Sequence, residues 1–199
     1  MEMVCATRNK GKAAEIAALL KNEFMVLSLD ELGIDEDIDE DGETFEENAV
    51  KKALGYMKLS GKIVLADDSG LEVDALGGAP GVHSAQFLGR DTPYAVKNRK
   101  LLEMLKVAKN RSARFRSCIA VAFPDGRVLT THAELSGEIA HEPAGEGGFG
   151  YDPVFYIPEY QMTLAEMNME QKNKISHRGK ALSEMKNLLD EIVKHMVSL

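Results

Sequence analysis

Cysteine is scarce in this sequence, with only Cys5 and Cys118 among 199 residues. Both lie in apolar, strand-like contexts, and the pair cannot form a ligand cluster of the zinc type. No apolar stretch approaches the ~20 residues that span a bilayer. The opening Met1-Glu2-Met3 also lacks the basic start of a signal peptide. These absences predict a protein of the reducing cytoplasm with no membrane partner.

Positive charge is absent from residues 30–47, which contain eleven acidic residues and no Lys or Arg. The whole chain has a net charge of −8, so the remainder carries a net charge of +3. A broad basic surface is therefore not expected, and neither is a nucleic-acid partner. An acidic segment on a mildly basic remainder suits a protein that binds a small polyanion and a metal ion. An acidic segment is also typical of a solvated surface.

Helical and strand-like segments alternate along the early part of the chain, and a hairpin pattern follows. Strands are predicted at 3–6, 24–27, 63–66, 113–123 and 127–135, and helices at 12–22, 44–59, 92–107 and along an apolar stripe from Leu182 to Met196. Thr44 and Glu47 match a capping box, and Thr92-Pro93 matches a helix start. This order predicts an α/β fold with a mixed sheet, in a single domain over residues 1–199.

A polar and basic segment, Thr7 to Lys12, lies between the first predicted strand and the first predicted helix. Such a turn presents free backbone N–H groups and the positive end of the helix dipole, which suits a phosphate group. Lys10 and Lys12 add positive charge. The spacing is not that of a Walker A loop. A surface turn with two solvated lysines is the alternative interpretation.

Two adjacent acids, Asp67 and Asp68, follow the apolar residues 63–66 and precede Ser69-Gly70. The predicted strand ends here, and neighbouring carboxylates at a strand end are costly unless a cation lies beside them. Mg²⁺ is the usual cation for such ligands. Because side chains alternate along a strand, only one of the two acids needs to face the metal. A plain turn is the alternative.

The segment Gly145 to Gly150 matches G-x-G-x-x-G, the pattern of a dinucleotide-binding loop. Pro143 before it and Pro153 after it exclude the flanking strand and helix that such a loop needs. What remains is a glycine-rich loop that presents Phe149, Tyr151 and Asp152. These side chains could stack on a flat ring and accept a hydrogen bond, or the loop could be an ordinary connection.

A basic segment that contains Lys172, His177 and Arg178 leads into the last predicted helix. Cations are unfavourable at the start of a helix, because they oppose its dipole. A bound anion or a ring carbonyl would relieve that cost, whereas a solvated basic face is the alternative.

Several separate motifs of the chain occur, in the same order, in the inosine triphosphate pyrophosphatase family, also called Ham1-like. The chain resembles this family over almost its whole length, and Arg8 stands where many members have Gly. The motifs are Ala6-Thr7-Arg8-Asn9-x-x-Lys12, Thr44-Phe45-x-Glu47-Asn48-Ala49, Leu65-Ala66-Asp67-Asp68-Ser69-Gly70-Leu71, Leu76-Gly77-Gly78-Ala79-Pro80-Gly81-Val82, Gly147-Gly148-Phe149-Gly150-Tyr151-Asp152-Pro153 and Ser176-His177-Arg178.

The resemblance implies an elongated, two-lobed α/β fold with a central mixed, twisted sheet flanked by helices and a substrate cleft between the lobes, usually in a homodimer. It implies Mg²⁺-dependent hydrolysis of the non-standard purine nucleotides ITP, dITP and XTP to the monophosphate and pyrophosphate. A nucleotide-binding sensor without turnover remains an alternative. A pyrophosphatase for modified pyrimidine nucleotides, as in the related Maf-like fold, is another.

The resemblance also implies roles for individual residues. Asp68 is the proton acceptor and a metal ligand, and Glu40 is the other metal ligand, although Asp39, Asp41, Glu43 and Glu47 lie close by in the sequence. The residues expected to hold the phosphates are Thr7, Arg8, Asn9, Lys10, Gly11, Lys12 and Ser69, with Lys172 as a further substrate contact. The residues expected to enclose the base are Phe149, Gly150, Tyr151, Asp152, His177 and Arg178.

Overall fold

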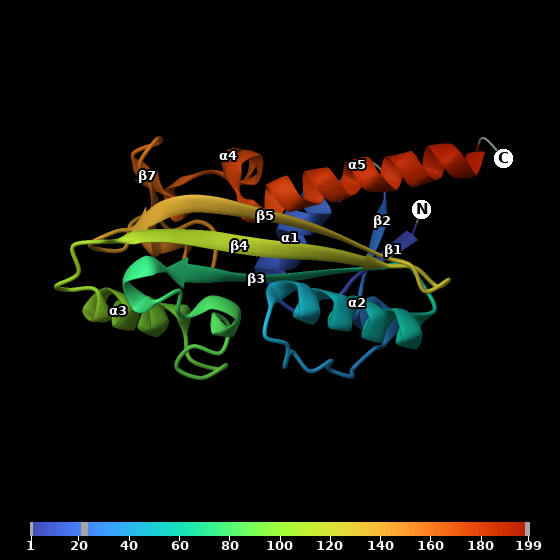
Figure 1. Cartoon of the computed structure of the whole chain (residues 1–199), viewed down its shortest axis with the longest axis horizontal. Coiled ribbons are helices and arrows are strands. Elements are labelled where there is room, and N and C mark those ends of the chain that lie inside the picture. Colours follow the sequence, from blue (N-terminus) through green and yellow to red (C-terminus); the bar gives the residue numbers. More distant parts are fainter. Residues whose placement is uncertain (1, 21–23, 198–199) are drawn as a thin grey trace. The chain divides into compact units, whose positions relative to one another are not determined.

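The structure is a computed structural model that describes residues 2–20 and 24–197, with side chains as far as residue 192 (Figure 1). In the described residues one sheet has the strand order β2-β1-β3-β4-β5-β6-β7. β1 pairs in parallel with β2 and β3, whereas β5, β6 and β7 pair antiparallel, so the predicted α/β class with a mixed sheet is confirmed. The strands are β1 Glu2–Cys5, β2 Met25–Ser28, β3 Val64–Val73, β4 Ser112–Ala122, β5 Val128–Ile139, β6 Phe155–Ile157 and β7 Met162–Thr163.

The helices follow the predicted order, and α4 is an addition that the sequence patterns did not identify. They are α1 Lys10–Leu20, α2 Phe45–Ser60, α3 Tyr94–Met104, α4 Met169–Ile175 and α5 His177–Val197. The last two residues of the helix predicted at 12–22 lie outside the described residues, as do the side chains of Val193 and Met196 in the predicted apolar stripe. α2 begins with the predicted capping box at Thr44. α3 begins after Pro93 without a side-chain cap, because the Thr92 hydroxyl donates to the Leu88 carbonyl instead.

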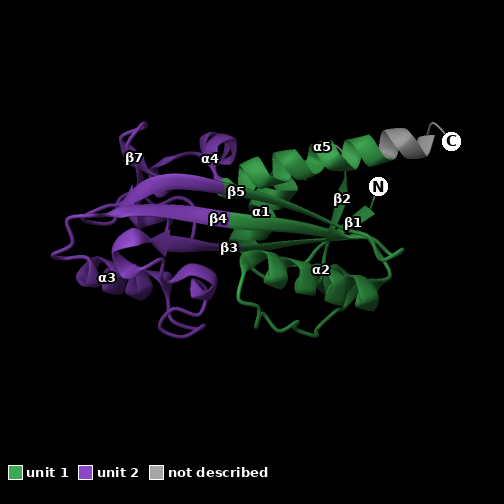
Figure 2. Cartoon of the chain, in the orientation of Figure 1, with its two compact units in different colours: residues 1–68, 117–133, 177–199 green, residues 69–116, 134–176 purple. Residues whose placement is uncertain are grey.

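The chain forms two compact units, and neither is a continuous piece of sequence (Figure 2). Unit 1 comprises residues 1–68, 117–133 and 177–199, and unit 2 comprises residues 69–116 and 134–176. The chain passes between the units four times. Three of the passages occur within the long strands β3, β4 and β5, which explains why the sequence contains no linker. A single domain with two lobes around a cleft stays a prediction.

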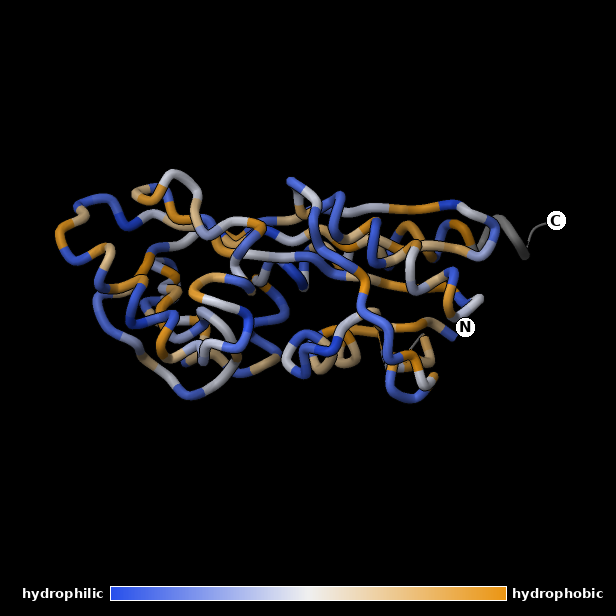
Figure 3. Tube along the Cα trace, turned by 90° about the horizontal axis from the view of Figure 1, so that it is seen from below, coloured by the Kyte–Doolittle hydropathy of each residue, from blue (hydrophilic) through white to orange (hydrophobic). Residues whose placement is uncertain are grey.

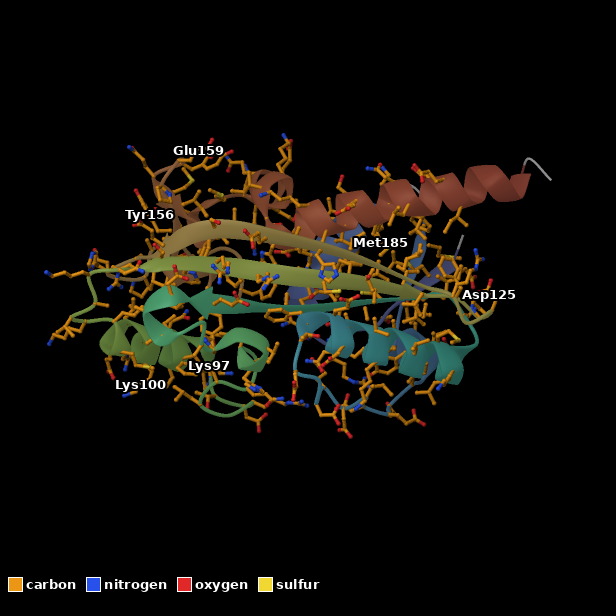
Figure 4. The ribbon with its side chains drawn as sticks, in the orientation of Figure 1. Lys97, Lys100, Asp125, Tyr156, Glu159 and Met185 are labelled. Carbon is orange, nitrogen blue, oxygen red and sulfur yellow. The ribbon has the colours of Figure 1, made fainter. Side chains whose placement is uncertain are left out.

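Unit 1 is built around a core that joins the first strand to the last helix. Met3 of β1, Leu65 of β3 and Ile119 of β4 pack with Leu182 and Met185 of α5. In Figure 4, Met185 lies between α5 and the strands. α5 covers one side of this part of the sheet and α2 covers the other (Figure 1). Both faces are thereby buried, so polar side chains on these strands need partners inside the protein.

Unit 2 has its own apolar core. Leu71 and Val73 of β3 pack there with Leu101 of α3, and the rings of Phe115 and Phe155 lie 4.6 Å apart. This core corrects one prediction: β3 does not end at Asp67 but continues through Ser69-Gly70 to Val73. The strand continues because Leu71 and Val73 alternate into the core of unit 2. The two acids therefore lie in the middle of a strand.

No helix within the described part of the chain is long and apolar enough to cross a membrane. Hydrophobic and hydrophilic stretches alternate along the backbone instead (Figure 3).

Candidate active site

The loop between β1 and α1 is shaped by its own side chains. The Asn9 side-chain oxygen accepts hydrogen bonds from the backbone N–H groups of Gly11 (2.9 Å) and Lys12 (3.2 Å). The Thr7 hydroxyl accepts one from the Asn9 N–H at 3.1 Å. Lys10 is exposed, whereas Lys12 points inward to the sheet. The loop therefore has a defined conformation before any ligand binds.

Asp67 is the most thoroughly paired acid of unit 1. Its carboxylate accepts hydrogen bonds from the Ser117 hydroxyl (2.7 Å) and Arg178 Nη2 (3.3 Å), and it pairs with Lys12 Nζ at 2.7 Å. Burial disfavours the charge, but Arg178 and Lys12 outweigh it and hold the pKa of Asp67 well below its usual range. Asp67 is thus a fixed negative charge that orients Lys12.

Asp68 points to the other side of β3, where it meets Lys52 of α2. Lys52 Nζ lies 3.5 Å from the Asp68 carboxylate and 3.1 Å from Glu40, and it donates to the Asp67 backbone carbonyl at 2.9 Å. Burial raises the pKa of Asp68 to about 6, even though Lys52 opposes the shift. For Glu40, burial is outweighed by Lys52, so the pKa of Glu40 is lowered. One lysine thus binds both predicted metal ligands.

Lys52 was missed in the sequence patterns, although a signal was present. It lies on the same helical face of α2 as the buried residues Ala49, Ala53 and Tyr56. A lysine within an apolar helical face indicates a buried partner of opposite charge. Two of the neighbouring acids have other contacts: Asp41 pairs with the exposed Lys51, and the Glu47 carboxylate accepts from the Glu43 N–H. This difference favours Glu40 among the acids of the segment.

The donor set of Glu40 and Asp68 fits a cation that arrives with a phosphate ligand. Asp68 Oδ2 is buried and has no hydrogen-bond partner within the described ranges. Among the described residues, no group of three or more His, Cys, Asp or Glu side chains could hold a metal ion alone. Mg²⁺ is commonly bound by one or two carboxylates, with water and substrate phosphates as the other ligands. Two carboxylates, one with an unused oxygen, meet that requirement.

The start of α5 is also buried within unit 1. Arg178 is 2% exposed, and its Nη1 donates to Glu15 of α1 at 2.5 Å while its Nη2 donates to Asp67. Two of its nitrogens bind these carboxylates, because two buried acids require a cation. The expected contact of Arg178 with a base carbonyl stays a prediction. Burial opposes the charge of Arg178, but Asp67 and Glu15 prevail and raise its pKa. Glu15 belongs to none of the sequence motifs, so its role as a partner of Arg178 was not predicted.

The Arg8 side chain has partners in the acidic segment, and its predicted contact with phosphate stays a prediction. Its guanidinium donates to the backbone carbonyl of Ile34 at 2.8 Å and pairs with Asp30 and Asp37. The side chain is therefore directed to the acidic segment.

The predicted base-binding residues of the glycine-rich loop come together with Lys172 in unit 2. Lys172 Nζ pairs with Asp152 at 2.5 Å and lies 4.6 Å from the centre of the Phe149 ring. The Asp152 carboxylate also accepts a hydrogen bond from the Phe149 N–H at 2.8 Å. Gly148, at φ +67°, has no room for a side chain because Asp152 would contact its Cβ. These contacts fix the loop around an aromatic ring with a lysine above it.

Each unit therefore gathers one set of the predicted residues. Unit 1 holds the loop Thr7–Lys12 with Glu40 and Asp68, together with the buried His177 and Arg178. Unit 2 begins at Ser69 and holds the glycine-rich loop and Lys172. The two cysteines, Cys5 and Cys118, are buried in unit 1, and burial raises the pKa of each thiol to about 12, so neither is a nucleophile near neutral pH.

Comparison with known proteins gives one consistent result. The model of the Ham1 family matches residues 3–188. The dITP/XTP pyrophosphatase of Desulforamulus reducens is 50% identical over 198 residues, covering 98% of each chain. That of Bacillus licheniformis is 46% identical over 193 residues, covering 96% of this chain and 98% of the relative. The solved Ham1 protein of Staphylococcus aureus is 40% identical and superimposes with a TM-score of 0.86, covering 96% of this chain and 99% of that one. The chain belongs to the Ham1 family.

Proposed function

We propose that this chain hydrolyses non-standard purine nucleoside triphosphates, namely ITP, dITP and XTP, to the monophosphate and pyrophosphate. The names of the relatives support this substrate class. The observation that carries the proposal is the group of Lys52, Glu40 and Asp68 in unit 1, together with Lys12 on Asp67. It combines acids for a metal with cations for phosphates.

The reaction requires a water molecule to attack the α-phosphorus while pyrophosphate leaves. Phosphoryl transfer of this kind depends on positioning and on neutralising charge. Asp68 accepts the proton of the attacking water. A carboxyl with a pKa of about 6 is ionised at neutral pH and is a stronger base than an ordinary aspartate.

Glu40 and Asp68 would hold Mg²⁺. When bound, the ion would lower the pKa of a coordinated water and offset negative charge on the phosphates. Lys12 and Lys52 would contact phosphate oxygens, and the N–H groups and side chains of the loop Thr7–Lys12 would orient them, with Ser69 as a further contact. When a nucleotide binds, Lys52 would replace a contact with Glu40 or Asp68 by a contact with a phosphate oxygen.

The purine would stack on Phe149, which contributes affinity without choosing among bases. Gly150, Tyr151 and Asp152 would enclose the base beside that ring, where Asp152 accepts from the Phe149 N–H and Lys172 lies over the ring. His177 would donate to the 6-carbonyl group that hypoxanthine and xanthine share and adenine lacks. Arg178 contributes by holding Asp67 and the start of α5.

Pyrophosphate release, measured over a panel of nucleoside triphosphates with and without Mg²⁺, tests the proposal. Release from ITP, dITP and XTP that far exceeds release from ATP, and that requires Mg²⁺, is the expected result. Preference for a pyrimidine triphosphate would overturn the substrate class. Tight nucleotide binding without release would indicate a sensor. We further propose that the protein works in the cytoplasm as a homodimer.

A further inference from the structure

The acidic segment that carries Glu40 needs external support. Residues 34–42 form no regular secondary structure, so the segment has no ladder of backbone hydrogen bonds. Six acidic side chains lie between Asp35 and Asp41, and their mutual repulsion opposes a single arrangement. Contacts from other parts of unit 1 must therefore hold it in place.

The second half of the segment rests on α2. Ile38 packs so closely on Gly55 that a Cβ at Gly55 would lie 2.7 Å from the Ile38 Cδ1 atom. The Asn48 side-chain oxygen accepts a hydrogen bond from the Gly42 N–H at 2.8 Å. These contacts lie on either side of Glu40, but they leave the first half of the segment unsupported by α2 except at the Glu36 carbonyl, to which the Tyr56 hydroxyl donates.

The first half of the segment is held by Arg8. Its Nη2 donates to the backbone carbonyls of Ile34 (2.8 Å) and Glu36 (3.3 Å). Its Nε donates to Asp37 at 3.3 Å, and its Nη1 donates to Asp30 at 3.2 Å. A planar guanidinium can satisfy several acceptors at once in fixed directions, which a lysine cannot do.

We propose that Arg8 is a positioning residue for Glu40. Arg8 belongs to the loop Thr7–Lys12 and binds the segment that contains Glu40, so it connects the groups that would hold the phosphates to a group that would hold the metal. The inference rests on the proposed metal role of Glu40. The Arg8 guanidinium contacts the acidic segment, so its removal is expected to loosen the metal site without removing a metal ligand.

Binding of Mn²⁺ to the full chain, followed by electron paramagnetic resonance in the presence of α,β-methylene-ITP, tests this without turnover. Arg8→Gln is expected to raise the Kd for Mn²⁺ several-fold, up to the ~10-fold loss at the low end of the range for second-layer residues. Asp37→Asn, which removes a negative charge that pairs with Arg8, is expected to shift the Kd less in the same direction. The control is Arg127→Gln, because Arg127 forms an exposed pair with Asp125 at 2.8 Å and is expected to leave the Kd unchanged.

A double variant separates positioning from a general loss of structure. If Arg8 acts through Glu40, then Arg8→Gln adds no loss to that of Glu40→Gln. If the fold-increases in Kd of the two single variants multiply in the double variant, or if Arg8→Gln leaves the Kd unchanged, the proposal for Arg8 is overturned while the metal role of Glu40 stands. An unchanged Kd in Glu40→Gln would instead overturn the metal role, and the inference for Arg8 with it.

Discussion

Asp67 and Asp68 are neighbours in β3, yet their pKa values are shifted in opposite directions. Burial raises the pKa of Asp68 to about 6. For Asp67 the same burial is outweighed by Arg178 and Lys12, and its pKa is lowered. The difference follows from the alternation of side chains along a strand, which places the two acids in different surroundings. Asp68 is therefore suited to accept a proton, whereas Asp67 is suited to remain charged.

Asp68→Asn should reduce pyrophosphate release from ITP by about 10²–10⁴-fold, the usual contribution of a general base. Binding of a non-hydrolysable ITP analogue should survive, because the amide has the same shape. Steady-state rates and equilibrium binding measure the two effects. Asp125→Asn at the exposed turn after β4 is the control (Figure 4), and wild-type turnover in Asp68→Asn would refute the assignment.

Arg178→Ala should lower the free energy of unfolding by about 3–5 kcal/mol, because it leaves Asp67 and Glu15 as buried charges that have lost a cation. Arg114→Ala is the comparison, since Arg114 pairs with Glu72 at 2.7 Å but is 40% exposed, and such pairs contribute about 0–1 kcal/mol. Denaturant unfolding monitored by circular dichroism gives both values. Equal losses would mean that burial does not set the strength of these pairs.

Among the elements, α2 carries Lys52 and begins with a reciprocal cap. The Thr44 hydroxyl accepts a hydrogen bond from the Glu47 N–H at 3.1 Å, and the Glu47 carboxylate accepts one from the Thr44 N–H. Thr44→Ala should therefore lower the free energy of unfolding by about 1 kcal/mol, as loss of such a cap does. Thr44→Ser keeps the oxygen and should retain most of the stability in the same denaturation experiment.

Gly55 in the middle of α2 should resist replacement. Alanine is preferred over glycine inside a helix by about 1 kcal/mol. Here, however, a Cβ would press on Ile38 at 2.7 Å, and overpacking costs about 1–3 kcal/mol. Gly55→Ala is expected to be destabilising alone and stabilising in the background of Ile38→Ala. A stabilising effect in both backgrounds would show that Ile38 does not pack on the helix as described.

Much of the fold could be predicted at this scale, because hydrophobic periodicity and caps act locally. The capping box at Thr44 and the apolar stripe of α5 are examples. The end of β3 could not, since its continuation depends on burial of Leu71 and Val73 in a core assembled from distant segments. α4 is capped by Asn168, but it has only seven residues and lacks a clear apolar period.

The sequence motifs identified several residues of the candidate site. They did not reveal which partners bind the arginine side chains. Asp68 and Glu40 lie together as expected, because both contact Lys52. The partners of Arg8 and Arg178 could not be read from the chain, since they lie 29 and 163 residues away. Pairing over such separations depends on the chain topology, which local sequence patterns do not reveal.

At the scale of the whole molecule, the family resemblance predicts a homodimer. The chain has a mass of 21.8 kDa, so light scattering at micromolar concentration should report a particle of twice that mass. A particle of monomer mass would contradict the prediction.

The core of unit 1 joins β1, the first described element, to α5, the last one. Domains usually fold during translation as their sequence emerges. Here Met3 and Leu65 pack with Leu182 and Met185, so the core of unit 1 cannot form completely until α5 has been synthesised. Until then the nascent chain exposes these apolar side chains, and chaperones have an opportunity to bind them. The interleaved order of segments thus makes assembly of the candidate site in unit 1 a late, nearly all-or-none event.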